Sequence, residues 1–167
     1  MASRIHSATQ LSIGWKCSSC GELITRIEDG CVEWLASEGP NGTTRVKGLR
    51  LVHNLASSPR GQDHDDCQYD YRREFRKDRS IVEGLSLESF VGVDGLMLLL
   101  SFIAANEMPE DEILELAKRV QIPGYEQTRD LFHEATEQGV VAPSLREGYY
   151  LQSEIRALQK WATSKVL

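Results

Sequence analysis

The first half of the chain alternates apolar and polar residues over short runs, the spacing that puts apolar side chains on one face of a β-strand. These runs cover residues 11–15, 23–27, 31–35 and 44–53. Loops rich in Gly, Pro, Asn, Ser and Asp follow the third and fourth runs. We therefore expect an antiparallel β-meander in this half of the protein.

The turn between the second and third runs predicts a register. Asp29 and Gly30 are a residue pair that favours a two-residue hairpin turn, because both central positions need a positive φ. Such a turn places Arg26 opposite Glu33, an opposite-charge pair that stabilises a ladder modestly.

The second half of the chain changes to the helical period. Residues 92–107 form an apolar run, and residues 110–121 carry apolar side chains at i, i+3, i+4 and i+7. Further helices are expected over residues 125–138 and from Ser153 onward. The longest apolar stretch, about ten residues, is half of the ~20 that a membrane span requires. We therefore expect residues 92–107 to be a buried helix and expect no membrane partner.

These patterns predict an α+β protein of 167 residues with two folded parts. The expected divisions are an N-terminal β-module over residues 1–70, a charged linker over 71–84 and a helical domain over 85–167. No charged segment followed by a long apolar run begins the chain, so a secretory signal is not expected.

The pair Cys17 and Cys20, separated by two serines and followed by Gly21, is the clearest chemical feature of the sequence. Two thiols at this spacing, between two short extended runs, are typical of half a zinc site. The remaining ligands would come from other Cys and His residues of the same half: Cys31, His53, His64 and Cys67. A metal there would explain how a small, loop-rich β-module stays folded.

Two ligand sets remain open at this point. In the first, His53 and Cys67 complete the site, because strand alternation puts Leu51 and His53 on one face. In the second, His64 and Cys67 form a compact knuckle in a polar loop. Cys31 lies within an apolar run, where a buried free thiol is expected. We favour Cys17, Cys20, His53 and Cys67 as the metal ligands.

The Cys-Ser-Ser-Cys-Gly knuckle resembles one half of a zinc ribbon, over roughly residues 11–70. That resemblance implies a metal-stapled β-structure of the kind used for docking to nucleic acid or protein. The chain departs from the ribbon pattern because it has no second Cys-x-x-Cys pair.

Redox and catalytic roles are the alternatives for the cysteines and histidines. A redox pair belongs at a strand-to-helix turn of a βαβ unit, which this segment is not. Asp63, Asp65 and Asp66 beside His64 could serve a metal-dependent nuclease or hydrolase. Since the sequence lacks the common nucleotide-binding and hydrolase motifs, we expect no enzyme and no small-molecule substrate. The few cysteines favour a reducing compartment, the cytoplasm.

The order of elements over residues 92–152 resembles a winged helix, with residues 125–138 as the recognition helix and residues 140–151 as the wing. Charge opposes direct DNA binding by this helical region. Residues 107–139 carry nine acidic and three basic side chains, which would repel a phosphate backbone. The helical domain is therefore expected to dock to a protein partner, or to be simply a small helical bundle.

A basic and aromatic segment is the better nucleic-acid candidate. Its basic residues lie among Tyr69, Tyr71 and Phe75; the candidate contacts are Arg72, Arg73, Arg76 and Lys77. The simpler interpretation is a solvated, charged helix. The sequence thus favours a non-enzymatic, zinc-binding adaptor or regulator with a protein partner. A nucleic-acid-binding regulator and a metal-dependent nuclease or hydrolase are the alternatives.

Overall fold

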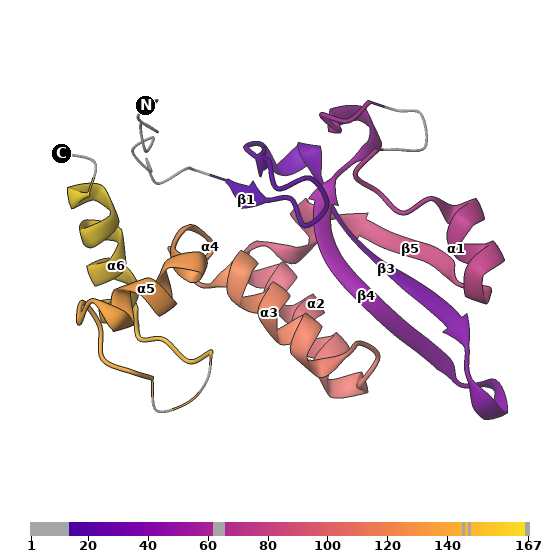
Figure 1. Ribbon diagram of the computed structural model, residues 1–167. Coiled ribbons are helices and arrows are strands. Elements are labelled where there is room, and N and C mark those ends of the chain that lie inside the picture. Colours follow the sequence, from indigo (N-terminus) through magenta and orange to yellow (C-terminus); the bar gives the residue numbers. More distant parts are fainter. Residues whose placement is uncertain (1–13, 62–65, 145, 147, 166–167) are drawn as a thin grey trace. The chain divides into compact units, whose positions relative to one another are not determined.

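The computed structural model describes residues 14–61, 66–144, 146 and 148–165 (Figure 1). By its internal contacts the described chain divides into two units, Gly14–Ile122 and the residues from Pro123 onward. The chain is α+β, with antiparallel strands near the Cys/His cluster and helices after them, which confirms the expected fold class.

Two small antiparallel sheets form the N-terminal part of the first unit. β1 (Trp15–Lys16) pairs with β2 (Leu23–Ile24). β3 (Gly30–Glu38) is the centre of a second sheet, between β4 (Thr44–His53) and β5 (Ile81–Ser86). Short 3-10 turns connect these elements, at Ile27–Asp29, Pro40–Gly42, Leu55–Ser57 and Leu87–Phe90.

The predicted hairpin through Asp29 and Gly30 is wrong. Residues Ile27–Asp29 form a 3-10 turn, and β2 pairs with β1 instead of β3. Glu33 therefore lies opposite Arg50 of β4 and Gly84 of β5, and not opposite Arg26. The long-range pairing is more stable than a local hairpin with β2, because β3, as the central strand, gains partners on both edges.

Residues 71–84, expected as a charged linker, contain α1 (Tyr71–Asp78) and the first part of β5. Asp70 caps α1, since its side chain accepts hydrogen bonds from the Arg72 and Arg73 N–H groups at 2.9 and 3.0 Å. α1 ends at Asp78, and the next residue, Arg79, has a φ of 63°.

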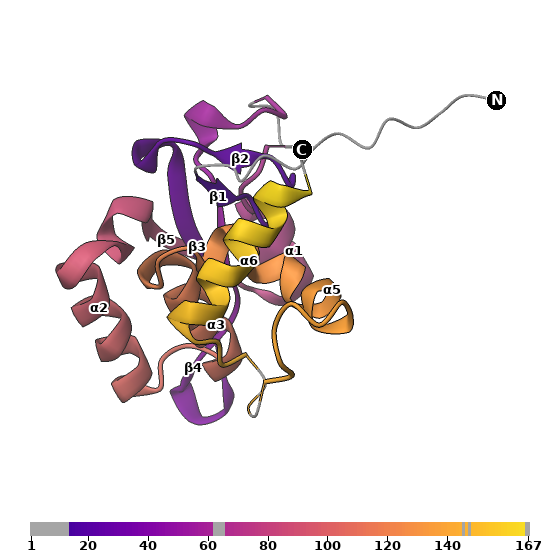
Figure 2. The ribbon, with the colours of Figure 1, turned by 90° about the vertical axis from the view of Figure 1, so that its left-hand side faces the viewer.

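Two helices pack together against the larger sheet. α2 (Gly92–Ala105) and α3 (Glu110–Gln121) lie side by side, and α3 contacts β4 (Figures 1 and 2). The shared core includes Trp34 of β3, Phe90 before α2 and Leu99 within it. Gly95 permits a close approach, because a Cβ there would lie 2.1 Å from the Phe90 carbonyl carbon.

α2 is not the buried helix that its sequence suggests. Gly95 and Leu99 are its fully buried residues, while Val93, Met97 and Leu100 are exposed. The reason is geometric, because a two-layer unit covers one side of a helix and α2 is apolar on its other side as well.

The second unit has its own small core around Phe132, Ile155 and Leu158. Its elements are α4 (Tyr125–Thr128), a 3-10 turn (Arg129–Leu131), α5 (Phe132–Glu137) and α6 (Gln152–Ser164). The expected helix over residues 125–138 is therefore interrupted. Among the described residues from 140 to 151 no strand forms, so the structure gives no support to a wing.

Candidate metal centre

A tight knuckle between β1 and β2 positions the first two thiols. The Cys17 N–H donates to the Glu22 carbonyl at 2.8 Å, and the Gly21 N–H donates to the Cys17 carbonyl at 3.0 Å. Gly21 has a φ of 81°, which a glycine adopts without steric cost. The Ser18 N–H donates to the Leu51 carbonyl at 2.8 Å, which fastens the knuckle to β4.

Four side chains meet at the end of β4: Cys17, Cys20, His53 and Cys67. Their ligand atoms all lie within 4.8 Å of one another. The His53 Nδ1 atom is 3.5 Å from the Cys20 Sγ atom and 3.8 Å from the Cys67 Sγ atom. Donors bound at about 2.0–2.3 Å to one tetrahedral ion lie about 3.5–3.8 Å apart, so the cluster can hold one metal ion.

His53 is oriented by both of its ring nitrogens. Its Nε2 atom lies 3.3 Å from the Leu23 carbonyl oxygen, which can only accept a hydrogen bond, so Nε2 carries the proton. The lone pair of Nδ1 then faces the thiols. A backbone carbonyl that fixes the tautomer in this way is the usual support of a metal-binding histidine.

The cluster is shielded from solvent. Cys17 and Cys67 are 2% and 0% exposed, His53 is 5% exposed and Cys20 is half-buried. The Ser58 hydroxyl donates to the Cys67 Sγ atom at 3.4 Å and accepts from the Cys67 N–H at 3.1 Å. Such donors to sulfur stabilise the thiolate form that a metal ion requires.

Cys17 and Cys67 lie in different environments, which shift the pKa values of their thiols in opposite directions. Burial raises the pKa of Cys17, but hydrogen bonds from the backbone N–H groups of Cys20 and His53 outweigh it and lower this pKa to about 6. Burial raises the pKa of Cys67 to about 12. Of these two thiols, Cys17 is therefore the one that loses its proton more readily.

Two candidate ligands remain, Cys31 and His64. Cys31 is outside the cluster, where the Gln68 side-chain amide donates to its sulfur at 3.3 Å and burial raises its pKa to about 12. That placement agrees with the expected packing role of this thiol. The alternative ligand His64 lies outside the described residues.

A buried ion pair supports the same end of the sheet. Glu33 is 1% exposed and accepts from the Arg50 guanidinium at 2.7 Å and from the Tyr69 N–H at 3.0 Å. The Arg50 guanidinium stacks 3.5 Å above the Tyr69 ring and donates to the Cys67 carbonyl at 3.2 Å. This network, which the sequence did not reveal, holds the Cys67 segment against β4.

The nucleic-acid candidates Arg72, Arg73, Arg76 and Lys77 all lie on α1 and are exposed. Arg73 pairs with Glu74 at 3.2 Å, and the Arg76 guanidinium donates to the Arg72 carbonyl at 3.2 Å. The structure thus places them on one solvated helix.

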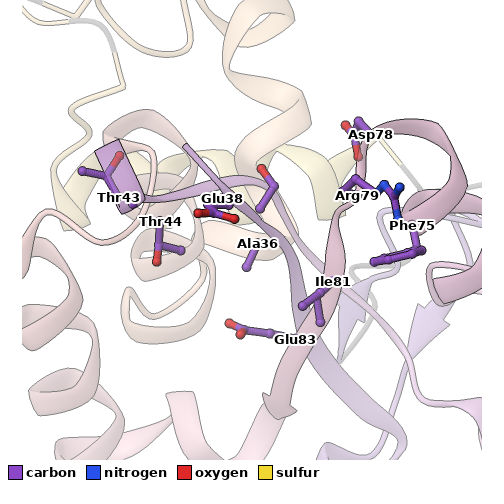
Figure 3. Close-up of a pocket in the computed structure, with 11 residues that line it drawn as sticks. Ala36, Glu38, Thr43, Thr44, Phe75, Asp78, Arg79, Ile81 and Glu83 are labelled. Atoms are coloured by element: carbon purple, nitrogen blue, oxygen red, sulfur yellow. The ribbon is translucent and has the colours of Figure 1, made fainter. Parts of the chain in front are cut away.

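A hollow of about 730 Å³ lies between the end of β3, the start of β4, α1 and the start of β5 (Figure 3). Two of its three carboxylates are already engaged: Asp78 pairs with Lys47, and Glu83 accepts from the Trp34 indole N–H at 2.9 Å. We assign no substrate to this hollow.

A scan against protein-family models, a search of curated proteins and a search of solved structures each gave no match. Within the described part of the chain, no helix combines the length and the apolar character that a membrane crossing requires.

Proposed function

We propose that this chain is a non-catalytic, zinc-binding adaptor in which the metal centre is structural and the surface of α2 binds another protein. Three thiols and one imidazole, with ligand atoms within 4.8 Å of one another, suit zinc better than the hard cations, which prefer oxygen ligands. Four protein donors would leave the ion no open position, and this favours a structural role over a hydrolytic one.

The observation that carries the protein-binding part is the outer face of α2. Five large apolar side chains, the α2 ridge, are solvent-exposed there: Val93 (80%), Leu96 (42%), Met97 (67%), Leu100 (50%) and Ile103 (37%). Their spacing of three or four residues places them along one stripe of the helix. A contiguous apolar stripe on a folded domain is typical of an interaction site.

The zinc centre and the ridge belong to the same unit, Gly14–Ile122. The Arg119 guanidinium of α3 donates to the Lys16 carbonyl at 2.6 Å, directly before the knuckle. Through this contact a metal-stapled knuckle would help to fix α3, and α3 packs against α2. Thiolates that hold zinc must stay reduced, so we also propose a cytoplasmic location.

Partner capture with a matched control tests this function. The double variant Met97→Glu, Leu100→Glu changes the ridge, while Ile81→Glu changes an exposed apolar residue of β5. We expect proteins recovered from a native extract by the wild type to be lost with the double variant and retained with Ile81→Glu. Equal recovery by all three chains would contradict the protein-binding role of α2.

One observation favours nucleic-acid binding as a second candidate. On α1, the exposed Tyr71 and Phe75 are spaced by four residues, as are Arg72 and Arg76. Exposed aromatic and cationic side chains on neighbouring stripes of a helix suit base stacking and phosphate contact. The acidic stretch that follows Arg79 weighs against it.

A further inference from the structure

We infer that the partner of the α2 ridge is an amphipathic helix flanked by Lys and Arg. This inference rests on the proposed protein-binding function and specifies the chemistry of the partner. The ridge spans residues 93–103, about 15 Å at the helical rise, which is close to three turns. An apolar stripe of that length matches the i, i+3, i+4, i+7 anchors of a second helix.

The backbone of α2 favours a helical partner over an extended one. The helix satisfies its own N–H and C=O groups, and its C-terminus is closed by the Asn106 N–H, which donates to the Ile103 carbonyl at 3.1 Å. An added strand would therefore find no hydrogen-bonding edge at the ridge. Affinity has to come from side-chain packing, which two crossed helices provide.

Charge determines the rest of the partner's chemistry. Between Arg79 and Lys118 the chain has eight acidic residues and no basic one. Asp94 lies on α2 itself, Glu107 directly after it, and Glu110 and Asp111 begin α3; all four are exposed. Basic side chains on both sides of the partner's apolar stripe would complement this rim, which improves specificity and the association rate.

The same rim argues against a second copy of this chain. Pairing two α2 ridges in either direction would bring acidic ends against acidic ends. Anionic lipid headgroups would be repelled for the same reason. A basic helix is the occupant that both the apolar stripe and its charges favour.

Three labelled peptides of about 18 residues, long enough to hold a helix, test the inference by fluorescence anisotropy with the full chain. The first has a Leu stripe with Lys elsewhere, the second has Glu in place of every Lys, and the third has the first composition in shuffled order. We expect the first to bind, and the other two to bind at least about tenfold more weakly.

Variants locate the binding site. Met97→Glu with Leu100→Glu should lower the affinity for the first peptide at least about tenfold. Asp94→Lys with Glu107→Lys should also lower this affinity and should reduce its dependence on salt. Ile81→Glu should leave the affinity for the first peptide unchanged. Because every substituted side chain is exposed, circular dichroism should show the same fold in all variants.

Three outcomes would overturn the inference: equal binding of the Glu peptide, equal binding of the shuffled peptide, or concentration-dependent dimers in sedimentation that Met97→Glu abolishes. Failure of the inference differs measurably from failure of the proposed function. If no peptide binds but the ridge variant still loses its captured protein, the basic-helix inference is wrong and the docking role stands. If capture is also unaffected, both are wrong.

Discussion

His53 is the residue on which the metal centre depends most, because it is held from both sides of its ring. The Leu23 carbonyl fixes Nε2, and Nδ1 lies within 3.8 Å of two sulfurs. Its place beside the cysteines could be predicted, since alternation along β4 puts it on the face of Leu51. The contacts that the Leu23 carbonyl and Ser58 make with the cluster could not be predicted, because they connect distant parts of the chain and have no sequence motif.

Cys17→Ser should abolish metal binding and destabilise the knuckle, because a structural zinc ion supplies folding free energy. Cys31→Ser is the matched control, since this thiol lies outside the cluster and should change neither property much. Metal content by mass spectrometry and thermal unfolding provide the two readouts. A Cys17→Ser protein that retains both the ion and the wild-type melting temperature would contradict the structural role.

The affinity for zinc should rise with pH, because binding displaces protons from the thiols. Cys67, with a pKa of about 12, loses a proton on binding at any pH near neutral. Cys17, with a pKa of about 6, contributes a further proton only below that pH. The logarithm of affinity plotted against pH should therefore be steeper below about pH 6 than above it. Competition with a chelator measures this slope, and an affinity independent of pH would contradict thiolate ligation.

Arg50→Ala should destabilise the first unit by about 3 kcal/mol or more, because it leaves the buried Glu33 carboxylate unpaired. Lys47→Ala removes an exposed pair with Asp78 and should cost much less stability, because solvent screens such a pair. Urea unfolding compares the two variants. Similar losses for both would show that the buried network does not hold the Cys67 segment in place.

Among the elements, those with a strong local pattern could be predicted and those that depend on distant partners could not. The helical periodicity of residues 110–121 predicted α3, and the alternation of residues 44–53 predicted β4. β5 was missed because Ile81–Ser86 is short, contains a glycine and forms only by pairing with β3, about fifty positions earlier in the chain. The hairpin between β2 and β3 failed for the same reason.

α2 shows how an apolar run can mislead. Its composition alone suggests burial, but the run has no polar face, so a helix covered on one side must expose apolar side chains on the other. That condition is visible in the sequence once the unit is known to have two layers. The layers themselves depend on the sheet, which local patterns did not specify completely.

Variants of α1 test the second candidate function, nucleic-acid binding. If α1 binds nucleic acid, neutralising Arg72 and Arg76 with Gln should weaken binding to a mixed DNA and RNA pool and reduce its salt dependence by about two charges. For the protein-binding adaptor we expect no binding even at low salt, where electrostatic attraction is strongest. Anisotropy across a salt series separates the two functions.

For the first unit as a whole, the Cys/His cluster connects three segments that lie far apart in the sequence. It joins the knuckle of residues 17–20, the end of β4 and the segment that leads into α1. A metal ion bound by this cluster would supply the stability that a small sheet would otherwise need from a disulfide or a larger core. Removing the metal should release the knuckle before the β3–β4 ladder opens.

X-ray absorption at the zinc edge, on full-length protein purified under reducing conditions, is the most direct test of the metal centre. We predict one zinc ion per chain, with three sulfur ligands at about 2.3 Å and one nitrogen ligand at about 2.0 Å. A chain that folds without zinc, or an ion surrounded by oxygen and nitrogen alone, would contradict the proposed zinc-stapled adaptor.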